Sequence, residues 1–148
     1  MPPAALILGV LGLIPFWGAA ALYAFGDPNQ RGVALLTLLA YSAAILSFLG
    51  GVRWGMEIAA GRRPRAWVLV LSTLPPIAAW LLLAGGGGAS LTEVQSLGGF
   101  LLAFVVQGVW DVRASDAPPW RRRLRLWLTV AAVLALGLAL GTTLGAGQ

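Results

Sequence analysis

The residues of this sequence that could do chemistry are few, and most are arginines and carboxylates set among apolar residues. Histidine and cysteine are both absent, which removes the commonest general base, the thiolate nucleophile and the usual ligands of transition metals. We therefore expect no catalytic residues, no metal site and no cofactor. What remains is the chemistry of charge, because guanidinium groups bind carboxylates and phosphates, and carboxylates exchange protons.

Two pairs of polar residues share a spacing of four, which places both members of a pair on one face of a helix. These pairs are Arg53 with Glu57 and Gln107 with Asp111, and both lie within apolar stretches. An ionised side chain at such a depth is costly and needs a partner. Glu57 is the nearest acceptor in the sequence, and Ser72, Gln107 and Asp111 are expected at comparable depth. We expect the Arg53 side chain to point inward and to contact at least one of these groups.

Two interpretations of this polar cluster stay open. In the first, Arg53 and Glu57 form an ion pair that only holds the helices together, while their charged ends reach toward water. In the second, the cluster is a buried site for a small anion, a proton or a lipid headgroup. A cavity beside Arg53 would favour the binding site, and tight packing would favour the structural pair.

Three prolines lie inside apolar stretches, at Pro15, Pro75 and Pro76. Each leaves the carbonyl group four residues earlier without its helical donor, and each favours a kink. Pro75 and Pro76 would free the carbonyl groups of Leu71 and Ser72. These acceptors would lie at the same depth as the polar cluster.

The elements that position these residues are five apolar stretches, each long enough to span a hydrocarbon core, which takes about 20 helical residues. Of the 148 residues, 59% are apolar and 10% charged, whereas a soluble domain carries about 25% charged residues. We expect an all-α polytopic membrane bundle that forms a single domain over residues 1–148. Its helices are predicted at about 4–25, 28–60, 66–84, 91–111 and 119–145.

Capping residues give two of these helices defined starts. Asp27, Pro28 and Gln30 fit an N-cap, a proline at the first helical position and an acceptor at the third. Ser90 and Glu93 fit a capping box of the S-x-x-E type.

The distribution of arginine predicts the orientation of the chain, because basic loops stay in the cytoplasm. Eight arginines occupy the second-to-third and fourth-to-fifth connections, namely Arg62, Arg63, Arg65, Arg113, Arg121, Arg122, Arg123 and Arg125. The opposite side carries only Arg31. We therefore predict a cytoplasmic N-terminus, an outer C-terminus, an outer turn at Gly85–Gly88, and a place in a bacterial inner membrane.

Small residues recur at every fourth position of the stretch 28–60, at Ala43, Ser47, Gly51, Gly55 and Ala59. Such a stripe allows helices to approach closely. We assign Ser47, Gly51 and Gly55 to helix packing, either within the bundle or in a homo-oligomer or larger membrane complex.

The segment from Arg113 to Arg125 interleaves basic residues with Pro118, Pro119 and Trp120, next to the membrane. It could clamp the headgroups of anionic lipids, and it also serves as a topology signal. The candidate headgroup ligands are Arg113, Trp120, Arg121, Arg122, Arg123 and Arg125. We expect no nucleic acid partner, although the isoelectric point is near 11.4, because the arginines lie between apolar spans.

Four segments resemble the transmembrane protein 69 family, and they follow one another in the same order along the chain. They are Gly12–Phe16 (GLIPF), Tyr41–Gly55 (YSAAILSFLGGVRWG), Leu71–Trp80 (LSTLPPIAAW) and Pro119–Thr129 (PWRRRLRLWLT). The resemblance implies a short multi-helix membrane domain, found in proteobacterial membranes and in mitochondria, with no established activity.

The chain departs from the pattern of that family at two places. The family usually has G-G-x-H-W-G where this chain has Gly50–Gly55 (GGVRWG), and W-Y where it has Trp120 and Arg121. The resemblance therefore carries over no histidine mechanism. What it implies at position 53 is a cation or a hydrogen-bond donor.

These observations favour a non-catalytic accessory, assembly or scaffolding module with a lipid-binding patch on its cytoplasmic face. The alternative is a small carrier or channel for an anion, a proton or an amphipathic metabolite, centred on Arg53. The odd number of helices argues against an inverted repeat within one chain, so a carrier would need to be a dimer. A third hypothesis, an enzyme that acts on lipids through Glu57 and Asp111, has no motif that selects a reaction.

Overall fold

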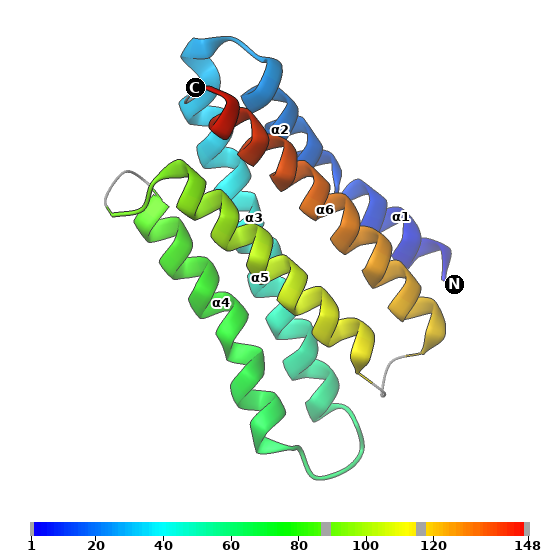
Figure 1. Cartoon of the computed structure of the whole chain (residues 1–148). Helices are drawn as coiled ribbons and strands as arrows, with labels where there is room; N and C mark the ends of the chain where they lie inside the picture. Colours follow the sequence, from blue (N-terminus) through cyan, green and yellow to red (C-terminus); the bar gives the residue numbers. More distant parts are fainter. Residues whose placement is uncertain (1, 87–89, 115–117, 147–148) are drawn as a thin grey trace.

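The computed structural model describes residues 2–86, 90–114 and 118–146, and all regular structure in these ranges is helical (Figure 1). The elements are α1 (Pro3–Leu11), α2 (Ile14–Phe25), the 3₁₀ turn η1 (Pro28–Gln30), α3 (Arg31–Ile58), α4 (Ala66–Gly86), α5 (Glu93–Arg113) and α6 (Pro119–Ala146). Helices α1 and α2 together make one stretch that is long and apolar enough to cross a membrane, and four further stretches each contain one of α3 to α6. The prediction of an all-α bundle with five membrane spans is confirmed. Which side each terminus faces stays a prediction.

The first span is interrupted where the sequence predicted a kink. Helix α1 ends at Leu11, and α2 begins at Ile14, one residue before Pro15. The hydroxyl group of Tyr41 in α3 donates a hydrogen bond of 2.8 Å to the carbonyl oxygen of Gly12. A side chain of a neighbouring helix thus satisfies a backbone acceptor at the break, as a backbone in lipid requires.

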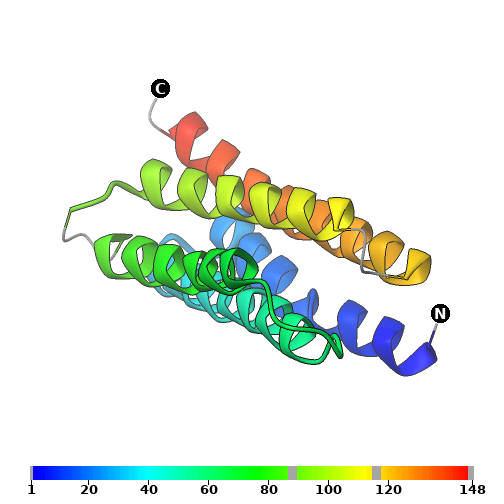
Figure 2. The ribbon, with the colours of Figure 1, turned by 90° about the horizontal axis from the view of Figure 1, so that it is seen from below.

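The helices form a closed ring in which each packs against the next. Helix α4 contacts α3, α3 contacts α2, α2 contacts α6, α6 contacts α5, and α5 contacts α4, while α3 also contacts α5 across the ring. Figure 2 shows the ring flattened into two layers, with α5 and α6 in one and α2, α3 and α4 in the other. Helix α3 is therefore the central element, and its inward face determines which residues meet at the centre.

Aromatic side chains fill the middle of the bundle. The ring of Phe16 packs edge-to-face against Tyr41 and Phe104, with ring centres 5.1 and 5.5 Å apart.

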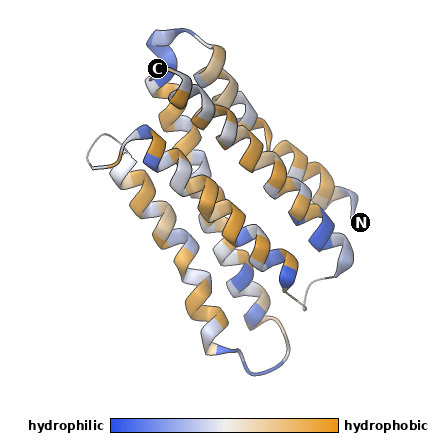
Figure 3. Cartoon of the chain, in the orientation of Figure 1, coloured by the Kyte–Doolittle hydropathy of each residue, from blue (hydrophilic) through white to orange (hydrophobic). Residues whose placement is uncertain are grey.

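The outer surface carries many large apolar side chains, such as Leu8, Phe25 and Trp127, which are well exposed. Figure 3 shows apolar residues along the helices, with strongly polar residues gathered near their ends. An exposed apolar surface of this extent suits lipid, and the chain is a multi-pass membrane protein.

Asp27 caps the start of the second span as predicted, since its carboxylate accepts a hydrogen bond of 2.8 Å from the backbone N–H of Asn29. The capping box predicted at Ser90 and Glu93 is wrong, because the box is formed two residues later by Thr92 and Gln95.

The end of α4 explains this shift. The backbone N–H groups of Ser90 and Leu91 both donate to the carbonyl oxygen of Gly85, which leaves Ser90 in the loop. The outer turn predicted at Gly85–Gly88 falls partly on α4, which continues through Gly86, while Gly87 and Gly88 lie outside the described residues.

The assignment of Gly51 and Gly55 to packing inside the bundle is wrong. Both are exposed, with no neighbouring side chain within 4 Å of an added methyl group, and Ser47 is half-buried. Gly50 makes the close contact instead, against Ser72 and Pro76 of α4. Helix α3 turns this face inward because the same face carries its buried charged residues.

Candidate functional site

Arg53 lies five residues before the end of α3, and its side chain points toward α5. Only 6% of the residue is exposed. Its Nε atom is 3.9 Å from Oδ1 of Asp111, and its guanidinium carbon lies 4.6 Å from the centre of the Trp110 ring. The prediction that Arg53 points inward and contacts one of the expected groups is confirmed by the contact with Asp111.

Asp111 links α5 to both α3 and α6. Its Oδ2 accepts hydrogen bonds of 3.0 and 2.8 Å from Nε and Nη2 of Arg125 in α6. Its Oδ1 accepts a longer bond of 3.3 Å from Gln107, one turn earlier on α5. Arg125 therefore makes the shortest contacts with this carboxylate, and Arg53 has only the longer ionic contact.

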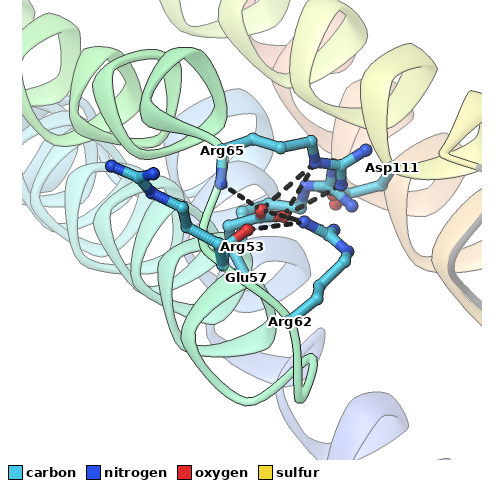
Figure 4. A network of polar contacts seen from close by, with 6 residues as sticks. Arg53, Glu57, Arg62, Arg65 and Asp111 are labelled. Carbon is cyan, nitrogen blue, oxygen red and sulfur yellow. Dashed lines mark hydrogen bonds and ion pairs between the residues drawn. The ribbon is translucent and has the colours of Figure 1, made fainter.

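Glu57 does not pair with Arg53, so the predicted ion pair between them is wrong. Its carboxylate accepts hydrogen bonds from Arg62 at 2.7 and 3.0 Å, and from the backbone and side chain of Arg65 at 2.6 and 2.9 Å (Figure 4). The chain reverses after α3 through Gly61, whose φ of 65° suits glycine. This tight reversal brings several donors onto Glu57, which binds the α3–α4 loop.

Positive charge exceeds negative charge around Arg53. Arg121 of α6 contacts the sulfur of Met56 in α3, and it lies within electrostatic range of Asp111, Arg125 and Arg53. The guanidinium groups at positions 53, 62, 65, 121 and 125 thus face the carboxylates at positions 57 and 111. Among the described residues, Nε of Arg53 is the one buried side-chain nitrogen or oxygen with no hydrogen-bond partner.

A pocket of about 380 Å³ opens beside Arg53 at this end of the bundle. Its walls come from the last two turns of α3, the α3–α4 loop and α4. The lining residues are Arg53, Met56, Glu57, Ala59, Ala60, Arg62 and Val68. The cavity that would distinguish a binding site from a tightly packed ion pair is therefore present.

Ser72 and the prolines of α4 stay apart from this pocket. The hydroxyl group of Ser72 donates to the carbonyl oxygen of Leu69 in its own helix, at 2.7 Å. Helix α4 continues as a single element through Pro75 and Pro76.

The residues predicted to bind lipid headgroups divide into two groups. Arg121 and Arg125 turn toward the interior cluster. Nε of Arg122 donates to the carbonyl oxygen of Val112 at 2.7 Å and so caps the end of α5. The remaining members lie at the surface, where Trp120 is half-buried and Arg113 and Arg123 are exposed.

A second polar cluster, at the opposite end of the bundle, was missed by the sequence analysis. The hydroxyl group of Tyr23 donates to Oε2 of Glu93 at 2.8 Å and shares a hydrogen bond of 2.8 Å with Thr143. Arg31 stacks on the ring of Tyr23 at 5.3 Å and donates to its carbonyl oxygen. The sequence places a carboxylate, Glu93, at the start of a helix, but no local sequence pattern identifies Tyr23 as its partner. Trp110, the aromatic partner of Arg53, was missed for the same reason.

A family model described as a protein of unknown function, DUF3429, matches residues 1–141. The chain belongs to this family. It is also similar to transmembrane protein 69 of Xenopus tropicalis, with 38% identity over 138 residues, which are 91% of this chain and 53% of that protein. The chain therefore spans about half the length of this curated relative. The resemblance to the transmembrane protein 69 family is confirmed, and no solved structure matches the chain.

In this DUF3429 protein, the segments that carry the resemblance contact one another. Tyr41 in the second segment bonds to Gly12 in the first, and Gly50 packs against Ser72 in the third. The fourth segment supplies Arg125, which joins the site through Asp111. The family-like segments thus build both the central helix contacts and the cluster around Arg53.

Proposed function

We propose that this protein is a non-catalytic membrane module that binds the headgroup of an anionic phospholipid beside Arg53. We place this end of the bundle at the cytoplasmic face of a bacterial inner membrane, because eight of the ten arginines lie in or within about two helical turns of its two connections. In this role the protein acts as an accessory, assembly or scaffolding component.

The observation that carries the proposal is a buried arginine whose Nε has no hydrogen-bond partner, beside an open pocket. Burying charge without compensation is costly, and positive charge is in excess around Arg53. A phosphate group supplies the missing negative charge, and guanidinium groups bind phosphate through two parallel hydrogen bonds. The pocket of about 380 Å³ has room for such a group.

A purely structural role explains Glu57 but not Arg53. Both oxygens of Glu57 accept hydrogen bonds from the loop that it anchors. Arg53, in contrast, reaches its nearest carboxylate only at 3.9 Å, because that carboxylate is held by Arg125. An ion pair that served stability alone would place its donors and acceptors within hydrogen-bond distance.

We favour binding over transport because apolar side chains occupy the middle of the bundle. Phe16, Phe100 and Phe104 are almost fully buried between the Arg53 site and the Tyr23 cluster. A carrier for an anion or a proton needs polar groups or water along its path. Among the described residues, the charged groups lie toward the two ends of the bundle.

Native mass spectrometry of the detergent-solubilised protein tests the proposal. We expect phosphatidylglycerol to bind more tightly than phosphatidylcholine. Loss of a charged hydrogen-bond donor, in Arg53→Gln or in Arg121→Gln, should weaken phosphatidylglycerol binding about tenfold. Arg63→Gln is the matched control, since Arg63 is exposed in the α3–α4 loop and the charge change is the same.

Equal phosphatidylglycerol affinity in Arg53→Gln, Arg121→Gln and Arg63→Gln would overturn the proposal. Arg121 is half-buried, so its variant reports on the site even where Arg53→Gln folds poorly. Full displacement of the lipid by millimolar inorganic phosphate would also overturn it, in favour of a site for a soluble anion.

A further inference from the structure

A second cavity, of about 610 Å³, lies on the lipid-facing side of the bundle between α4 and α5. We call it the α4–α5 groove. Its lining combines exposed leucine and valine side chains, several small residues and the buried Leu46 and Gln107. The lining residues are Leu46, Leu71, Leu74, Pro75, Ala78, Leu81, Leu82, Gly99, Leu102, Ala103, Val106, Gln107 and Trp110.

Specific contacts mark both ends of the α4–α5 groove. At one end, Leu82 of α4 packs so closely on Gly99 of α5 that an added methyl group would clash with it. At the other end, Gln107 and Trp110 line the groove, and Trp110 carries the guanidinium group of Arg53 on its face. The groove and the pocket therefore lie on either side of the stacked pair of Arg53 and Trp110, because Trp110 lines the groove and Arg53 lines the pocket.

The length of the groove matches one leaflet of a bilayer. Leu71 and Leu82 mark its extent along α4, and a helix rises about 16 Å over that interval at 1.5 Å per residue. A hydrocarbon core is about 30 Å thick, so the groove covers about half of it. The end of the groove next to Arg53, which we call its basic end, lies where the headgroups of that leaflet would begin.

We propose that the α4–α5 groove holds one acyl chain of the phospholipid whose headgroup occupies the pocket beside Arg53. This inference rests on the proposed function, and it names the ligand as an anionic phospholipid of the leaflet at the basic end. An acyl chain gains no hydrophobic free energy on entering the groove, because the surrounding lipid is equally apolar. Its contribution is shape, because a chain that fits the groove makes more van der Waals contacts than a disordered neighbour.

Filling the groove with a bulky side chain tests this inference. Ala78→Trp places an indole ring in the groove from α4, and Val106→Trp does so from α5. Ile77→Trp is the matched control, since Ile77 is adjacent, exposed and outside the groove lining. The readout is native mass spectrometry with dioleoyl phosphatidylglycerol and with the short-chain dihexanoyl form.

We expect both groove variants to weaken binding of the dioleoyl lipid about tenfold, and to leave the dihexanoyl lipid unchanged. Ile77→Trp should change neither. Wild-type affinity of Ala78→Trp and Val106→Trp for the dioleoyl lipid would overturn the inference. If Arg53→Gln still weakened binding in that case, the headgroup site would stand without the groove. If Arg53→Gln also had no effect, the proposed function would fail as well.

Discussion

The carbonyl oxygen of Ser72 in α4 faces Gly50 in α3 so closely that a methyl group on Gly50 would lie 2.5 Å from it. Pro76 has no N–H to donate to this carbonyl, so the oxygen is free to project from the helix. The same methyl group would lie 2.8 Å from the ring of Pro76. Glycine at position 50 therefore allows the two helices to approach at the point where proline alters α4.

Gly50→Ala should destabilise the protein more than Gly51→Ala does. The first variant forces backbone atoms apart, and overpacking of this kind costs about 1 to 3 kcal/mol. The second places its methyl group in open space. Thermal unfolding in detergent measures the difference. Equal melting temperatures for the two variants would show that α3 and α4 do not meet at Gly50.

Asp111→Asn should be strongly destabilising, because Arg53 and Arg125 both lose their carboxylate. Removing one partner of a buried ion pair costs about 3 to 5 kcal/mol. Asp27→Asn is the control, since asparagine caps a helix about as well as aspartate. Thermal unfolding of the two variants checks the prediction, and a small effect of Asp111→Asn would contradict the central place given to this carboxylate.

Glu57→Gln should loosen the α3–α4 loop without unfolding the bundle. The neutral amide replaces a carboxylate that binds Arg62 and Arg65, and it loses the charge that strengthens those hydrogen bonds. We expect faster trypsin cleavage after these two arginines. Glu93→Gln, at the opposite end of the bundle, should leave the cleavage rate in this loop unchanged. A cleavage rate in Glu57→Gln that equals the wild-type rate would show that Glu57 does not hold the loop.

The absence of cysteine makes the orientation directly measurable. Arg63→Cys and Asn29→Cys place single thiols at exposed positions on opposite ends of the bundle. In intact cells, a membrane-impermeant maleimide should label the thiol at position 29 and not the one at position 63. The reverse pattern would place the Arg53 site on the outer face, away from the cytoplasmic leaflet.

Hydropathy sufficed to predict the helices because membrane thickness sets the length of each span. The predicted helix ends lie within two residues of those in the structure, apart from the break between α1 and α2 and the start of α3, where the 3₁₀ turn η1 occupies residues 28–30. The side-chain partners were harder to predict, because they depend on how α3 is rotated about its axis. Arg53 and Glu57 share a helix face, yet one meets Trp110 on α5 and the other meets the α3–α4 loop.

The stripe of small residues shows the same difficulty in another form. Spacing alone indicated a helix contact at Gly51 and Gly55, whereas the neighbouring Gly50 makes it. One residue shifts the contact by about 100° around a helix, and the rotation is set by the buried charges on the inward face. The Tyr23 cluster, likewise, joins residues from α2, α5 and α6 that no local pattern connects.

Whether a lipid phosphate lies against Arg53 can be measured by solid-state NMR of the protein in phosphatidylglycerol vesicles. With ¹⁵N in the arginine guanidinium groups, dipolar dephasing by ³¹P reports direct contact with the headgroup. We predict a dephased guanidinium signal in the wild-type protein that is lost in Arg53→Gln and retained in Arg63→Gln. Identical dephasing in the wild-type protein and in Arg53→Gln would contradict the proposed headgroup site.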